Sequence, residues 1–306
     1  MTVALFTHPD MLAHAPPERH SESPARLRAV TEALADSDLS LEPCEAPLAQ
    51  DEDLVLVHPH RYLAALEAAE PREGRRPLDG GDTWLNPGSI AAARRAAGAV
   101  AAAVRWIAAG EGTRAFCAVR PPGHHAGAQR PMGFCLFSNV AIGARVARSV
   151  GFERVAVVDF DVHHGNGTQE IFERDPSLFL ASIHQSPNWP GTGDPSETGV
   201  GNIANLTVPP YARREAWRAS FERLLDPVDA FAPDLILISA GFDAHARDPL
   251  AEQQLEAEDY AWATRAVVSV ANARAGGRVV SSLEGGYDLA ALGQSAVAHV
   301  RALQGA

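Results

Sequence analysis

The stretch Val155–Gly167 reads VAVVDFDVHHGNG and joins an apolar run to a polar, glycine-rich segment. The run Val155–Phe160 is apolar except for one aspartate, which is typical of a strand buried on both faces of a parallel sheet. Side chains alternate along a strand, so Asp159, Asp161 and His163 share one face where the strand ends. A carboxylate and an imidazole two residues apart can bind one metal ion there. The alternative is that Asp161 caps the next helix.

Five further apolar runs show the same pattern between segments with helical periodicity. They are Val3–Thr7, Ala115–Val119, Leu178–Ile183, Leu235–Ser239 and Val279–Leu283. Most are followed directly by a polar segment, namely RPPGHHAG, HQSPNWPGTG, AGFDAH and EGGYD. The pattern predicts an α/β fold with a parallel sheet covered by helices. Ligands bind such sheets at the carboxyl ends of the strands, so these segments should converge on one site.

The composition describes an ordinary globular chain with a large core. The 306 residues are 46% hydrophobic and 21% charged, and no linker or repeat interrupts them, so we expect a single domain over residues 1–306. No apolar run approaches the roughly 20 residues that cross a bilayer, which argues against a membrane protein. Cys44, Cys117 and Cys135 are odd in number and lack CxxC spacing, so a reducing cytoplasm is the expected location.

The net charge of −12 restricts the partners of the protein. It results from 38 acidic and 26 basic residues and argues against nucleic acid, whose phosphates require a basic surface. A neutral or cationic partner is easier to accommodate. The sequence leaves the oligomeric state open.

A third oxygen ligand follows another predicted strand. Asp243 ends the segment LILISAGFD, in a position that corresponds to Asp161. Two carboxylates and the imidazole of His163 leave positions open on Zn²⁺, as catalytic zinc sites require. Taken alone, Asp243 could equally be a helix N-cap.

Two adjacent histidines and a tyrosine complete the candidate site. His124 and His125 follow the run Ala115–Val119, and a general base of this kind needs a second group to fix its tautomer. Asp159 and Asn166 are the available partners, and an acid beside one imidazole and an amide beside the other would give the pair different basicities. The tyrosine of SSLEGGYD, Tyr287, could donate to an oxyanion or be an ordinary half-buried tyrosine.

Taken together, these motifs resemble those of the zinc-dependent histone deacetylase superfamily. The matching segments, in chain order, are RPPGHHA, GFCLFSNVAI, DFDVHHGNGTQ, PGTG, SAGFDAH and LEGGYD. His20–Leu27 (HSESPARL) and Val57–Leu63 (VHPHRYL) also match, so the similarity extends from about His14 to Gly286. It is closest to class II and to bacterial acetylpolyamine amidohydrolases. The resemblance implies the three-layer arginase/deacetylase fold, a central parallel sheet of about eight strands with helices on both faces.

The resemblance also implies two metal sites. By motif position, Asp161, His163 and Asp243 would be the ligands of one Zn²⁺, and a carboxylate-rich site of this kind also accepts Fe²⁺ or Co²⁺. A structural K⁺ would lie beside the zinc, partly on backbone oxygens. Its implied ligands are Asp159, Asp161, His163, Ser182 and Ile183.

The same resemblance assigns the catalytic roles. His124 and His125 become the acid/base pair, with Asp159 behind the first and Asn166 behind the second. Class I relatives carry an aspartate at the position of Asn166, which favours class II. Tyr287 becomes the donor to the oxyanion.

Substrate recognition is also implied by motif position. Gly133 and Phe134 on one side and Trp189 on the other would wall a narrow tunnel for an aliphatic chain. Gly285 and Gly286 leave room beside the tyrosine, and Gly286 is expected to border the substrate. Polyamine-selective relatives tend to place a glutamate seven residues after the last zinc ligand, where this chain has Leu250. The expected substrate is therefore an acylated lysine or another small-molecule or peptide acyl amine, with acetylpolyamines as the alternative.

Two other functions predict different residues. A two-manganese ureohydrolase of the related arginase fold would need an aspartate two residues after His163, where this chain has Gly165. A non-catalytic metal-containing binding protein would be expected to lose the tyrosine or one of the paired histidines, and all three are present. The sequence therefore favours a zinc-dependent amidohydrolase.

Overall fold

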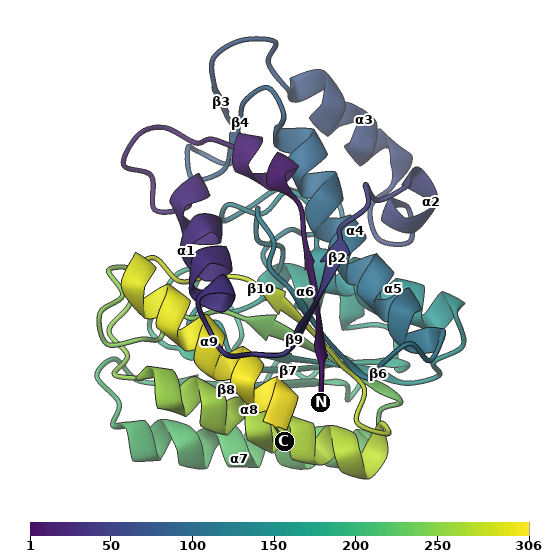
Figure 1. Ribbon diagram of the computed structural model, residues 1–306, viewed down its shortest axis with the longest axis vertical. Helices are drawn as coiled ribbons and strands as arrows, with labels where there is room; N and C mark the ends of the chain where they lie inside the picture. Colours follow the sequence, from purple (N-terminus) through teal and green to yellow (C-terminus); the bar gives the residue numbers. More distant parts are fainter. Residues whose placement is uncertain (306) are drawn as a thin grey trace.

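The computed structural model describes residues 1–305, and its centre is a sheet of eight strands, all parallel to their neighbours (Figure 1). In spatial order the strands are β2 (Leu41–Glu45), β1 (Val3–Thr7), β5 (Arg114–Cys117), β10 (Val279–Leu283), β9 (Leu235–Ala240), β6 (Val155–Asp159), β7 (Leu178–Gln185) and β8 (Ile203–Val208). The α/β fold and the parallel sheet predicted from the sequence are confirmed.

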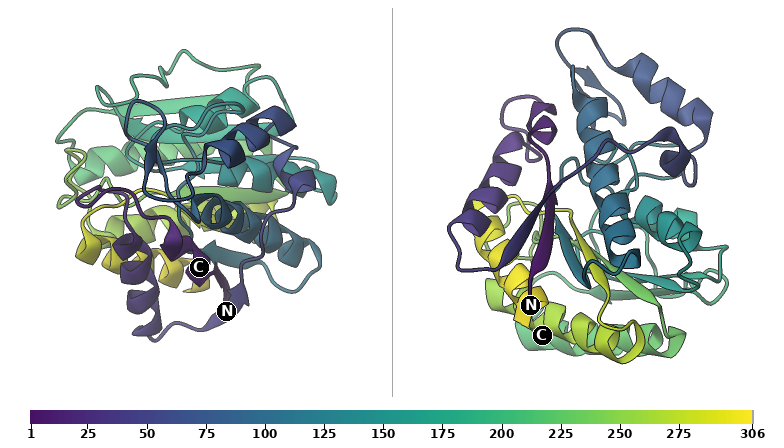
Figure 2. Two further views of the ribbon diagram at one scale, coloured as in Figure 1. Left: turned by 90° about the horizontal axis from the view of Figure 1, so that it is seen from above. Right: turned by 45° about the vertical axis from the view of Figure 1, so that its right-hand side comes forward.

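Helices cover both faces of this sheet (Figures 1 and 2). One face is covered by α4 (Ser89–Ala108), α5 (Asn139–Ser149) and α6 (Asn166–Phe172), and the other by α1 (Pro24–Ala35), α7 (Arg214–Phe231), α8 (Ala257–Arg274) and α9 (Leu289–Gly305). The remaining elements are η1 (Pro9–Ala13), α2 (Asp51–Leu54), α3 (His60–Ala69) and the hairpin of β3 (Arg76–Pro77) and β4 (Trp84–Leu85). One continuous cluster of buried apolar side chains fills the space between the layers.

All six strands expected from apolar runs are present, but the two edge strands were missed. β2 has the sequence LEPCE and is largely exposed, so no apolar run marks it. β8 alternates buried and partly exposed residues, because an edge strand is covered less completely. The segment Pro71–Gly81 includes β3 and leads into the short hairpin.

The strand order explains how distant motifs meet. The four central strands β5, β10, β9 and β6 are adjacent in space although β5 and β10 are more than 150 residues apart in sequence. Because all strands are parallel, the loops that follow them open at the same edge of the sheet.

No helix in residues 1–305 has both the length and the hydropathy needed to span a membrane. The three cysteines are free thiols, two of them buried.

Candidate active site

Three side chains at the carboxyl ends of β6 and β9 form a compact cluster. The Nδ1 atom of His163 lies 3.2 Å from Oδ1 of Asp161 and 3.1 Å from Oδ2 of Asp243. Both carboxylates are buried, and each accepts a backbone N–H, from Gly285 to Asp161 and from Val162 to Asp243. Within residues 1–305 this is the one set of three such side chains whose ligand atoms approach within 4.8 Å.

The geometry of this cluster fits a divalent metal ion. Two ligands about 2.1 Å from a tetrahedral ion lie roughly 3.4 Å apart, close to the separations observed. Gly285 leaves the room: a Cβ atom at this position would lie 2.6 Å from Oδ2 of Asp161 and 2.7 Å from Cγ of Asp243. The donor set of two carboxylates and one imidazole suits Zn²⁺ and other first-row ions.

The alternative that these aspartates cap helices is excluded. Helix α6 begins at Asn166 with Gly165 as its N-cap, four residues beyond Asp161. After Asp243 the next helix is α8, which begins at Ala257 with its own capping box.

The electrostatics of the cluster follow from burial and close opposite charges. Burial opposes protonation of His163, but its bonds to the two carboxylates outweigh this and raise its pKa to about 10. Burial, together with the nearby charge of Asp161, raises the pKa of Asp243 to about 6. The pKa of Asp161 is lowered despite its burial, mainly by His124 and His163. The cluster therefore holds a proton between two carboxylates, a position that a cation can take over.

The two adjacent histidines follow β5 and have different partners. His124 Nδ1 lies 3.0 Å from Oδ2 of Asp159, and His125 Nδ1 lies 2.8 Å from Oδ1 of Asn166. Burial opposes the charge on His124, but Asp161 and Asp159 outweigh it and raise its pKa to about 10. Burial and the charge of His124 lower the pKa of His125 well below its ordinary value. The pair thus combines a cationic and a neutral imidazole.

Tyr287 stands across from the histidines, beyond the end of β10. Burial raises the pKa of its phenol well above 10, so the hydroxyl keeps its proton. The guanidinium of the buried Arg26 lies 4.8 Å from the centre of the tyrosine ring and donates to the backbone oxygens of Glu284 and Gly286. Arg26 thereby fixes the loop that carries Tyr287.

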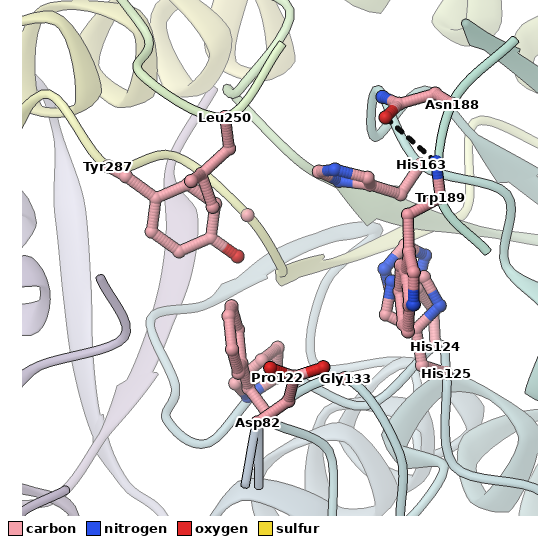
Figure 3. Close-up of a pocket in the computed structure, with 12 residues that line it drawn as sticks. Asp82, Pro122, His124, His125, Gly133, His163, Asn188, Trp189, Leu250 and Tyr287 are labelled. Atoms are coloured by element: carbon pink, nitrogen blue, oxygen red, sulfur yellow. Dashed lines mark hydrogen bonds between the residues drawn. The ribbon is translucent and has the colours of Figure 1, made fainter. Parts of the chain in front are cut away.

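A cavity of about 220 Å³ connects these groups. Tyr287 and Leu250 enter it from one side, and His163 and the histidine pair from the other (Figure 3). The cavity is lined by Asp82, Pro122, His124, His125, Gly133, Phe134, His163, Asn188, Trp189, Leu250, Gly285 and Tyr287.

The expected tunnel walls lie in this lining, with one difference. The Trp189 ring packs edge-on against His125 at 4.7 Å and is 40% exposed, and Phe134 packs edge-on against Tyr287 at 5.9 Å. Gly286, expected beside the substrate, is absent from the lining, and Gly285 is there instead. With φ at +123°, Gly286 turns away, and a Cβ atom there would meet Leu292.

Sequence reasoning missed several residues that shape the site. The carboxylate-bearing Asp82 lies in the lining. Asp248 accepts the backbone N–H groups of Leu250 (3.0 Å) and Tyr287 (2.7 Å), so one carboxylate holds two lining residues. Glu284 accepts the N–H of His124 at 3.2 Å, and burial raises its pKa to about 7. A glutamate in the motif LEGGYD was the available signal for the last of these.

Of the residues expected around K⁺, Asp159 ends β6, Asp161 and His163 follow it, and Ser182 and Ile183 lie within the neighbouring strand β7. Asp159 and Ser182 are register partners on the two strands, and both are fully buried. The Ser182 hydroxyl lies 3.0 Å from Nδ1 of His184. The potassium site itself stays a prediction.

Comparisons with known proteins identify the family of this chain. Residues 20–303 match the histone deacetylase domain. The chain belongs to the histone deacetylase family. Among family members, a probable deacetylase of Methanothermobacter thermautotrophicus is 40% identical over 94% of this chain and 87% of its own length. A histone deacetylase-like amidohydrolase of Pseudomonas aeruginosa is 40% identical over 94% of this chain and 77% of its own length.

Plant members of the histone deacetylase family are also similar. Histone deacetylase 14, chloroplastic, of Arabidopsis thaliana is 39% identical over 94% of this chain and 74% of its own length. The crystal structure of the HDA15 HD domain superposes with a TM-score of 0.93 at 35% identity, covering 99% of this chain and 88% of that one. The arginase/deacetylase fold is thus confirmed, and the chain is a hydrolase of the histone deacetylase family.

Proposed function

We propose that this enzyme is a zinc-dependent amidohydrolase that removes acetyl-like acyl groups from acylated lysine side chains or a related alkyl amine. The observation that carries the proposal is the single cavity lined by His163 of the candidate metal cluster, the histidine pair and Tyr287. An amide bound in this cavity would lie beside the candidate metal ligands, a base and a hydroxyl that can donate a hydrogen bond.

The three residues of the candidate metal cluster would hold the Lewis acid of the reaction. A zinc ion bound by Asp161, His163 and Asp243 would act as a Lewis acid that polarises the acyl carbonyl and acidifies water. The buried carboxylates and Gly285 shape the position that such an ion would take.

His125 is the general base in this proposal. Its Nδ1–H donates to Asn166, which leaves Nε2 with a lone pair, and its lowered pKa keeps the ring neutral. Nε2 takes a proton from the attacking water as the new C–O bond forms. The same proton then passes to the amine nitrogen as the C–N bond breaks. His124 keeps its own proton, because Asp159 and Asp161 hold its pKa at about 10.

Tyr287 donates to the oxyanion that forms at the acyl carbon. Its phenol is protonated at neutral pH, and the hydroxyl points into the cavity (Figure 3). Preorganised donors of this kind account for a large share of acyl-transfer catalysis.

Leu250 favours acyl-lysine among the substrates. It lines the cavity and offers an apolar surface, with no charge for a remote ammonium group. Acetylpolyamines remain the second candidate because Asp82 lines the same cavity and its carboxylate could bind a remote ammonium group. The net charge of −12 attracts either cation.

Two further features belong to this proposal. A structural K⁺ beside Asp159 and Ser182 is supported by the burial of both polar side chains at paired positions of adjacent strands. The three free cysteines support a reducing compartment such as the cytoplasm.

The test is hydrolysis by the zinc-loaded enzyme of acyl-lysine peptides, acetylpolyamines and small acylated amines. We expect acetyl-lysine peptides to react best. Leu250→Glu should then raise kcat/KM for acetylspermidine-type substrates relative to these peptides by about tenfold, through a charge-assisted contact. A wild-type enzyme that already prefers acetylpolyamines would put the second candidate first. No hydrolysis of any amide by metal-loaded protein would refute the proposal.

A further inference from the structure

The tunnel wall contains a turn with an unusual backbone. Gly133 and Phe134 are consecutive residues with φ of +53° and +72°, both in the left-handed region, and both line the cavity. A residue with a Cβ atom adopts this conformation only where surrounding groups impose it. The Phe134 side chain therefore reaches the cavity because something else holds its backbone.

The groups that hold this turn come from the β3–β4 connection, about 50 residues earlier in the chain. The N–H of Gly133 donates to Oδ2 of Asp79 at 2.9 Å, and the N–H of Phe134 donates to Oγ1 of Thr83 at 2.9 Å. These two side chains are bonded to each other, since the Thr83 hydroxyl donates to Oδ2 of Asp79 at 2.7 Å. Thr83 is fully buried. The Thr83 hydroxyl thus donates to Asp79 and accepts from the N–H of Phe134, which links the carboxylate to the tunnel wall.

The wall has little freedom to move without changing the cavity. A Cβ atom at Gly133 would lie 2.5 Å from Cη2 of Trp189 and 2.7 Å from Cδ2 of His125, so the turn touches the opposite wall and the base. The ring of His20 packs edge-on against Phe134 at 4.9 Å. A shift of a few tenths of an ångström at this turn therefore alters the width of the tunnel.

We propose that Asp79 and Thr83 are positioning residues that set the width of the substrate tunnel by holding the Gly133–Phe134 turn. The proposal rests on the proposed function, because it assigns the residues that select the chain threaded through that site. Neither side chain lines the cavity or belongs to the metal cluster, so both act on substrate binding rather than on the chemical step.

The test compares two hydroxamates on the zinc-loaded enzyme. One carries a straight five- or six-carbon linker, which would extend along the tunnel wall, and the other is acetohydroxamate, which has only a methyl group beyond its metal-binding atoms. Thr83→Val keeps the shape of the side chain but removes both hydrogen bonds. It should weaken the long hydroxamate about tenfold and leave acetohydroxamate within about twofold. Thr83→Ser restores the hydroxyl and should restore the long hydroxamate to within about threefold of wild type.

Further variants separate positioning from general damage. Asp79→Asn leaves only one acceptor oxygen and should show the same selective loss, and the double variant should lose no more than either single variant, because both break one chain of bonds. Thr31→Val, in α1 and remote from the cavity, is the matched control. In kinetics, KM for an acetyl-lysine peptide should rise about tenfold with kcat within about threefold.

The outcomes decide between two explanations. Equal weakening of both hydroxamates, or an unchanged ratio in folded Thr83→Val, would overturn the positioning role. If Thr83→Val does not fold, the ratio for Asp79→Asn decides by the same criterion. Hydroxamate binding needs no turnover, so failure of the proposed hydrolysis would remain distinguishable from failure of this inference.

Discussion

Gly285 tests whether the cluster of Asp161, His163 and Asp243 is a metal site. Its φ lies outside the left-handed region, so alanine meets no backbone strain here, and the substitution Gly285→Ala adds only a methyl group. That methyl carbon would lie 2.6 Å from Oδ2 of Asp161 and 2.7 Å from Cγ of Asp243, against about 3.4 Å for ordinary contact. Asp161 must therefore move by about 0.8 Å, and Asp243 must move further, because its Oδ2 lies closer still to the added methyl group.

The size of the effect follows from the tolerance of metal coordination. Ligand distances in metal sites hold within about 0.2 Å, so a displacement several times larger removes one or both carboxylates from the ideal position. Changes beyond the ligands already cost about 10- to 100-fold in metal affinity. Gly285→Ala acts on two ligands together, and we expect a loss of zinc affinity of about 100-fold or more, equivalent to about 2.7 kcal/mol.

The assay is competition for zinc with a chelator of known affinity, with circular dichroism to show that the variant is folded. Gly305→Ala is the matched control, because no atom lies within 4 Å of the position of its added methyl group at the end of α9. The control should bind zinc like the wild type. Wild-type zinc affinity in folded Gly285→Ala would refute the assignment of the two aspartates as ligands.

Three other predictions address the ligands, the oxyanion donor and a buried histidine. Asp161→Ala and Asp243→Ala should each lose zinc by elemental analysis, and full occupancy in either would remove that residue from the ligand set. Tyr287→Phe should lower kcat by about 10²–10³ with metal content unchanged, and wild-type kcat would exclude the donor role. Burial lowers the pKa of His299 from 6.5 to about 3, so its neutral form stabilises the fold above pH 6.5, and this contribution is lost as pH falls towards 3. In urea titrations, the unfolding free energy of His299→Gln should therefore fall less steeply below pH 6.5, by about 1.4 kcal/mol per pH unit, and equal slopes would refute this.

The cluster of Asp161, His163 and Asp243 could be predicted from sequence because each of its residues has a local signature. Asp161 and His163 follow a run that is apolar on both faces, and Asp243 follows another. Parallel strands have their carboxyl ends at one edge, so periodicity alone brings these residues to the same region. That inference did not require knowing that β9 and β6 are neighbouring strands. Their adjacency does determine the distances between Asp161, His163 and Asp243.

The residues that support the site could not be predicted in the same way. Arg26 bonds to Gly286 across 260 positions, and Asp79 bonds to Gly133 across 54. Arg26 lies in the first turn of α1 and Asp79 in the loop between β3 and β4, and a charged residue at either place is ordinarily expected to be solvated. Burial of Arg26 is visible only once α1 packs beside the end of β10.

The same long-range packing supports the divalent cation proposed for this site. Three carboxylates, those of Asp159, Asp161 and Asp243, contact two histidines that hold protons, His124 and His163, which leaves one negative charge in a buried region. Buried charge is costly unless it is balanced. A divalent ion that displaces the proton of His163 adds one net positive charge and brings these five groups to neutrality. His124 and His163 supply the two positive charges that offset the three carboxylates, and only the proton of His124 would remain after metal binding. The partners that keep His124 protonated therefore matter to metal binding as well as to acid/base chemistry.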